Sequence, residues 1–149
     1  KLFSSSNLKI DKLEKVKSNF FNKKKNYNNK IKKIFSNEIK SLEEVVNTKN
    51  FIVSNSWIES ADRSMFHQVH NHGALGYSAV CFVDYDETQH TPTQFISPFN
   101  NFLNGSILSH SPEQISEGSI LFFPSVIHHY TIPNESNIER TILSFNLSQ

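Results

Sequence analysis

The chain has 149 residues, 37% of them hydrophobic and 12% aromatic, which favours one folded domain with a packed core. It contains no apolar run near the roughly 18 residues needed to span a bilayer and no secretory signal pattern at its start. Its single cysteine, Cys81, excludes a disulfide framework and a cysteine-rich zinc site. We therefore expect a protein of the reducing cytoplasm.

Charge divides the chain near Asn50. Thirteen lysines against five acids give residues 1–50 a net charge of +8, whereas two arginines against nine acids give residues 51–149 a net charge of −7. All seven histidines also lie in the second part. We predict a basic helical segment over 1–49 that packs on a β-domain over 50–149. The lysines are expected to solvate outer helix faces rather than to bind nucleic acid.

Hydrophobic spacing predicts the elements in chain order. Apolar residues three to five apart favour a helix over 8–20, and a cleaner amphipathic stripe favours a second helix over about 30–47. From Phe51 onward, short β-rich runs separated by turn clusters predict about eight strands at 51–53, 66–72, 77–85, 95–96, 106–109, 119–123, 129–132 and 140–147. So many short strands without intervening helices predict a small antiparallel sandwich or barrel.

Two histidines separated by one residue form the first candidate site. If residues 66–72 are extended, His70 and His72 point to the same face with Cα atoms about 6.5 Å apart, and both imidazoles can bind one metal ion. By the same alternation, His67 is expected on the opposite face. A later histidine, 128 or 129, opens a strand and can close onto the pair, and the spacing does not choose between the two.

The last strand carries an unusual polar face. Arg140, Ile142, Ser144 and Asn146 share one side of an extended strand, and the other side is core-like. Arginine, serine and asparagine beside a core-like face are unusual for plain packing. A lone arginine is more often solvated or salt-bridged than part of a ligand site, but its place on the strand after His129 strengthens the ligand interpretation.

Five segments together resemble a family of 2-oxoglutarate/Fe(II)-dependent oxygenases known in bacteria and phages. They are His70-x-His72, residues 78–83, residues 117–129, residues 133–134 and residues 139–147. The similarity runs from about Ser56 to the end of the chain. It implies a double-stranded β-helix (a cupin-like jelly roll) preceded by helices, in agreement with the strand count.

The resemblance also implies the roles of individual residues. It makes His70, His72 and His129 the ligands of Fe(II), and Arg140 the partner of the C5 carboxylate of 2-oxoglutarate, which a planar guanidinium can bind with two hydrogen bonds. Most such enzymes have a carboxylate two residues after the first histidine, where this chain has His72.

A second departure concerns the cosubstrate. The usual Arg-x-Ser pair places a hydroxyl two residues after the arginine, but here that residue is Ile142. Ser144, on the same face as Arg140, is the expected replacement donor.

The expected reaction is hydroxylation of an unidentified small molecule or protein side chain, with oxidative decarboxylation of 2-oxoglutarate to succinate. Two alternatives stay open. One is a cupin-type three-histidine metal enzyme that does not use 2-oxoglutarate, because Gly118 and Pro124 match the cupin turn, although residues 73–77 lack the cupin glutamate. The other is a non-catalytic jelly-roll binding module. A homodimer is compatible with the exposed edges of such a sheet.

Overall fold

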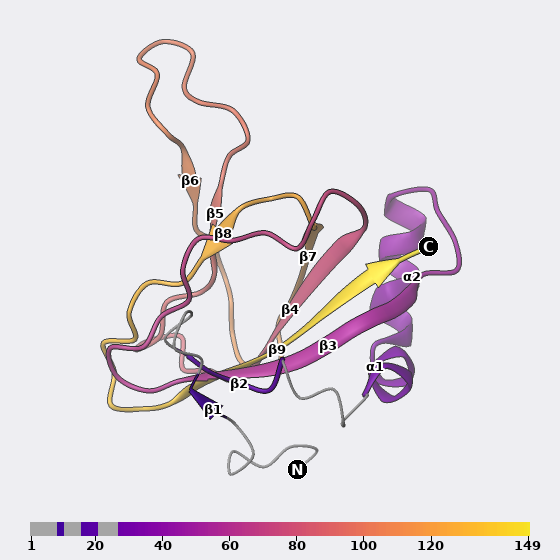
Figure 1. Cartoon of the computed structure of the whole chain (residues 1–149), viewed down its shortest axis with the longest axis horizontal. Coiled ribbons are helices and arrows are strands. Elements are labelled where there is room, and N and C mark those ends of the chain that lie inside the picture. The colour runs from indigo at the N-terminus through magenta and orange to yellow at the C-terminus, as the bar shows by residue number, and fades with distance from the viewer. Residues whose placement is uncertain (1–8, 11–15, 21–26) are drawn as a thin grey trace.

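The computed structural model describes residues 9–10, 16–20 and 27–149, and its described part is mainly β with two helices (Figure 1). The elements are β1 (Lys9–Ile10), β2 (Lys17–Ser18), α1 (Asn28–Ile34), α2 (Ser36–Val45), β3 (Ile52–Ala61), β4 (Tyr77–Asp84), β5 (Gln94–Ile96), β6 (Ser109–His110), β7 (Ile120–Pro124), β8 (His129–Tyr130) and β9 (Arg140–Ser148). The predicted fold class, a jelly roll with helices before it, is confirmed.

Two antiparallel sheets form the body of the protein. The larger has the order β1-β2-β3-β9-β4-β7, and the smaller has the order β6-β5-β8. Residues of both sheets meet in one apolar cluster, where Val80, Phe82 and Ile142 of the larger sheet pack with Phe95 of the smaller one. The space between the sheets is therefore the interior of the β-roll.

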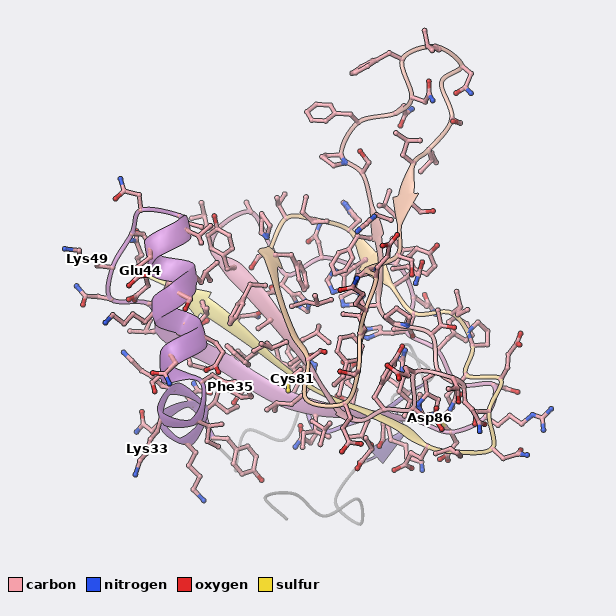
Figure 2. All side chains as sticks on the ribbon, turned by 180° about the vertical axis from the view of Figure 1, so that it is seen from behind. Lys33, Phe35, Glu44, Lys49, Cys81 and Asp86 are labelled. Carbon is pink, nitrogen blue, oxygen red and sulfur yellow. The ribbon has the colours of Figure 1, made fainter. Side chains whose placement is uncertain are left out.

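A second apolar cluster lies on the outer face of the larger sheet, under the helices. Ile31 and Ile39 of the helices are buried against Cys81 and Phe145 of the strands. In Figure 2, Phe35 lies on the sheet side of the helices and Lys33 on their outer side. The four lysines of these two helices, Lys30, Lys32, Lys33 and Lys40, are exposed, as expected for an amphipathic helix pair.

The predicted helix over 30–47 is confirmed in kind but is broken in the middle. Phe35, with φ −99° and ψ 27°, separates α1 from α2, and its ring stacks on Phe145 with centroids 5.4 Å apart. Packing against the sheet thus fixes a residue that periodicity alone would place inside one helix.

The predicted helix over 8–20 is wrong within the described residues. β1 pairs with β2, and β2 pairs with the end of β3, so this stretch extends the larger sheet. Val16 and Ser18 are buried two residues apart, the period of a strand rather than of a helix. Leu8 and Leu13, two of the apolar residues on which this helix prediction rested, lie outside the described residues.

β3 is much longer than the predicted run over 51–53. It pairs with β9 from Ile52 to Ala61, with a register shift between Val53 and Asn55. The polar stretch 54–56 concealed this strand from sequence analysis. The domain boundary proposed near Asn50 falls between α2 and β3, and it stays a prediction.

Between β5 and β6 the chain projects from the body as an arm over residues 97–108 (Figure 1). Phe102 and Leu103, near its tip, are 91% and 97% exposed. Neither helix of the described chain has the length and apolar character required to cross a membrane.

Candidate metal centre

Backbone pairing brings the histidines together from segments about 60 residues apart in the chain. The N–H of His70 donates to the carbonyl of His129 at 3.0 Å, and the N–H of His129 donates to the carbonyl of His70 at 2.9 Å. On the other side, β8 pairs with β5, where His129 is opposite Phe95. Because His129 is held from both sides, its side chain is fixed over the interior.

Three imidazoles converge at this point. One ligand nitrogen each of His70, His72 and His129 lies within 4.8 Å of the others. Nε2 of His72 and Nε2 of His129 are 3.2 Å apart. A metal ion about 2.1 Å from each nitrogen separates two ligand nitrogens by about 3.0 Å at a right angle and about 3.4 Å at a tetrahedral angle. The observed separation therefore fits two ligands of one ion.

Hydrogen bonds select the nitrogen that faces the centre. Nδ1–H of His70 donates to the carbonyl of Gln68 at 2.8 Å, and Nδ1–H of His129 donates to the carbonyl of Ile127 at 3.0 Å. A carbonyl oxygen can only accept, so the proton is on Nδ1 and the lone pair is on Nε2 in both rings. Such a backbone partner is the usual orienting contact of a metal-binding histidine.

Burial keeps the three rings in the neutral form that metals bind. Desolvation lowers the pKa of His72 to about 4 and that of His129 to about 3, and it also lowers the pKa of His70. At neutral pH no proton has to leave before these nitrogens bind a cation. The chemistry of this donor set fits Fe(II).

The structure distinguishes the two adjacent histidines. His129 is buried and faces the pair, whereas His128 is exposed, with its Nε2 3.2 Å from the side-chain nitrogen of Asn71. Extended neighbours point to opposite faces, so His129 alone of the two joins the cluster.

Arg140, the first residue of β9, is buried and has hydrogen-bonding capacity to spare. Its NH1 donates to the carbonyl of Thr91 at 2.8 Å, while its Nε has no hydrogen-bond partner among the described residues. The side chain lines a small pocket with, among others, Gln89, Thr91 and Asn134. An unpartnered buried N–H beside a pocket is what a carboxylate ligand would satisfy, so Arg140 fits the predicted binding of 2-oxoglutarate.

The polar face predicted for the last strand faces the interior. Ile142 packs in the cluster between the sheets, whereas Leu143 and Phe145 pack under the helices. Ser144 is buried opposite Trp57, four residues from Arg140 and hence about 13 Å along the strand. Its predicted role toward the cosubstrate stays a prediction.

Three further residues surround the histidines: Trp57, which the sequence suggested as a core or pocket-wall aromatic, His67, which it placed on the wrong face, and Glu59, which it missed. Trp57 lies against the ring of His72, with centroids 5.1 Å apart, and His67 stacks on His70, with centroids 3.8 Å apart and planes 16° from parallel. Both donate to the buried carboxylate of Glu59. The expectation that His67 lies away from His70 is wrong, because residues 65–72 form one isolated bridge rather than a regular strand.

A jelly roll that gathers three neutral imidazoles around one point and also buries an arginine defines a mononuclear metalloenzyme. Residues 55–146 match the family described as "Putative 2OG-Fe(II) oxygenase". The chain belongs to this family, whose enzymes use Fe(II) and 2-oxoglutarate. The resemblance seen in the sequence is thereby confirmed.

Solved structures agree on the fold. A prolyl-4-hydroxylase from Pseudomonas putida superposes with a TM-score of 0.64 at 11% identity, over 97% of this chain and 79% of that one. The viral collagen prolyl hydroxylase of Paramecium Bursaria Chlorella virus-1, solved with 2-oxoglutarate, gives 0.57 at 13% identity, over 91% and 80%.

A Burkholderia pseudomallei oxidoreductase of the 2OG-Fe(II) oxygenase family gives a TM-score of 0.53 at 15% identity, over 72% of this chain. The chain spans 48% of the length of that protein. No curated protein matches this chain in sequence.

Proposed function

We propose that this protein hydroxylates a substrate in a reaction coupled to the oxidative decarboxylation of 2-oxoglutarate to succinate. One observation carries the proposal: one ligand nitrogen from each of three neutral imidazoles lies within 4.8 Å of the others, in a domain that also buries an arginine whose Nε has no hydrogen-bond partner among the described residues. The family match supports the same reaction class.

In this proposal His70, His72 and His129 hold Fe(II) through one nitrogen each. The carbonyls of Gln68 and Ile127 keep two of these rings oriented before the metal arrives. When bound, Fe(II) supplies the activation of dioxygen that drives decarboxylation of 2-oxoglutarate and oxidation of the substrate. The protein's own part is to hold three ligands and leave the remaining positions open.

Arg140 would bind the C5 carboxylate of 2-oxoglutarate. Its guanidinium is held by the carbonyl of Thr91, which orients the remaining N–H donors without using them up. Burial lowers the pKa of Arg140, because the cation lacks water around it, so an incoming anion relieves a cost already present in the free protein.

Aromatic side chains exclude water around the histidines. The ring of Phe123 lies 4.8 Å from that of His129, and Phe95 lies 6.0 Å from it on the neighbouring strand. Trp57 covers His72 from the larger sheet. A dry environment strengthens the electrostatic interactions of the centre and protects reactive species from water.

Succinate formation tests the proposal without knowledge of the substrate. Purified protein is incubated with Fe(II) and 2-oxoglutarate under air, beside His129→Ala and the matched control His110→Ala, which changes an exposed histidine of β6. We expect succinate from the wild type and from His110→Ala, and background levels from His129→Ala.

Two results would contradict the proposal. Equal succinate formation by the wild type and His129→Ala would show that the reaction does not require the three-histidine centre. Tight metal binding by the wild type without any 2-oxoglutarate turnover would favour the cupin-type enzyme instead.

A further inference from the structure

We propose that Glu59 is a positioning carboxylate for the three-histidine centre: it fixes two ligand rings through Trp57 and His67 and places a negative charge beside a ligand set that has none. The inference goes beyond the proposed function but rests on its metal centre.

The contacts of Glu59 divide its two oxygens between two partners. Oε1 accepts a hydrogen bond from Nε1–H of Trp57 at 2.8 Å, and Oε2 lies 3.0 Å from Nδ1 of His67. Because the carboxylate is 5% exposed, these partners replace the water it has lost. Burial by itself would raise the pKa of Glu59, but the hydrogen bonds of His67 and Trp57 lower it overall, so the group is ionised.

Each partner in turn contacts a different ligand ring. His67 stacks almost parallel on His70, and Trp57 lies across His72 with the planes at 52°. One carboxylate therefore controls two of the three rings, each through a single intermediate side chain. A shift of Glu59 would move His67 and Trp57 and, through them, both rings. Groups hydrogen-bonded directly to a ligand typically contribute 10- to 100-fold to metal affinity, and Glu59 acts on two rings at once and also carries a charge.

Charge gives a second reason. Non-haem Fe(II) sites usually include one carboxylate ligand, whereas the three imidazoles here are neutral and the metal brings two positive charges into the interior. Among the described residues, Glu59 is the one buried acid. Attraction between Glu59 and the cation is weakly screened in this low-dielectric interior.

A simpler role is available, and the experiment has to separate it. Arg140 is also buried, and its charge attracts Glu59. On β3 and β9, Arg140 is opposite Ala61, and Glu59 is opposite Ile142. Glu59 and Arg140 are therefore diagonal neighbours on the same face of the sheet, two residues apart in register. If Glu59 serves only to balance Arg140, its removal changes folding stability or 2-oxoglutarate binding and leaves the metal unaffected.

The test measures metal binding rather than turnover. Glu59→Gln keeps the shape and removes the charge, and Glu117→Gln, at an exposed acid, is the matched control. We measure the Kd of Co(II), a stand-in for Fe(II), by calorimetry, its visible absorption spectrum, and the Tm of the metal-free proteins. We expect a Kd 10- to 100-fold higher and a shifted Co(II) spectrum for Glu59→Gln, with Glu117→Gln unchanged.

A Glu59→Gln protein that folds and binds Co(II) within twofold of the wild type, with the same spectrum, would overturn the proposal. Should that variant fail to fold, Trp57→Phe removes one of the two donors and keeps an aromatic ring. We then expect a several-fold higher Kd and a shifted spectrum, and an unchanged Kd and spectrum would overturn the proposal equally. Wild-type protein that binds Co(II) but forms no succinate would contradict the proposed function alone.

Discussion

Replacement of Arg140 by methionine should separate ligand binding from folding. In the free protein the guanidinium makes one described hydrogen bond, to Thr91, and its charge attracts the buried Glu59, so methionine leaves that carboxylate without this cation. We expect the Tm to fall by about 4–8 °C, or about 2 kcal/mol for a chain of this size. Binding of 2-oxoglutarate should suffer far more.

The size of that loss follows from the hydrogen bonds. A hydrogen bond to a charged group contributes about 1.5–3 kcal/mol, so loss of one such bond to the C5 carboxylate raises the KM for 2-oxoglutarate roughly 10- to 150-fold. Succinate formation at varied 2-oxoglutarate concentration measures the KM, and Arg63→Met is the control. Arg63, the other arginine of the chain, is exposed and donates to Asn137. A KM for Arg140→Met within threefold of the wild type would refute the reasoning.

Three further predictions concern the ligands, a turn and the thiol. His72→Asp introduces the carboxylate found in most such enzymes, so the Kd of Fe(II) measured without oxygen should fall; a higher Kd would contradict this. Gly76→Ala places a Cβ 2.3 Å from the carbonyl oxygen of Leu147 at φ +86°, and should lower the Tm by about 6–12 °C in thermal unfolding, because strain and clash together cost about 3 kcal/mol. Gly105→Ala, at φ +72° with open space, should lower the Tm clearly less, and equal losses would exclude the clash. Burial raises the pKa of the Cys81 thiol to about 11, so the thiolate that reacts is suppressed in the folded state until the pH approaches that value. At pH 8 we expect alkylation of native protein at least about 100-fold slower than of unfolded protein, and equal rates would show that the thiol is open to solvent.

The strands of the β-domain were predictable because their apolar residues alternate with the pleat. Residues 77–84 carry one apolar face toward the helices and another toward the interior, residues 140–148 carry an apolar face toward the helices and a mostly polar one toward the interior, and both runs were found. Most of β3 escaped because Ser54, Asn55 and Ser56 form a polar stretch at a register shift. Residues 16–20 were misread because pairing with β3, a contact distant in sequence, determines their structure.

The site residues that lie on regular strands or at their ends were predictable from the alternation of side chains. His70, His72 and His129 converge as the spacing and the family resemblance implied, and Arg140 is buried with an Nε that has no hydrogen-bond partner among the described residues. The stacking of His67 on His70 was not predictable, because it depends on an irregular segment that alternation does not describe. Glu59 was missed for a related reason: its strand was not recognised, so nothing placed it near the histidines.

Mutual hydrogen bonding between the main chains of His70 and His129 has a consequence for metal exchange. Main-chain hydrogen bonds hold two of the three ligands together, so these residues keep their relative positions when the metal ion dissociates. Loss of iron to a chelator should then be reversible on simple readdition, without a refolding step. The protein would offer a preformed metal site whose occupancy depends on the concentration of free Fe(II).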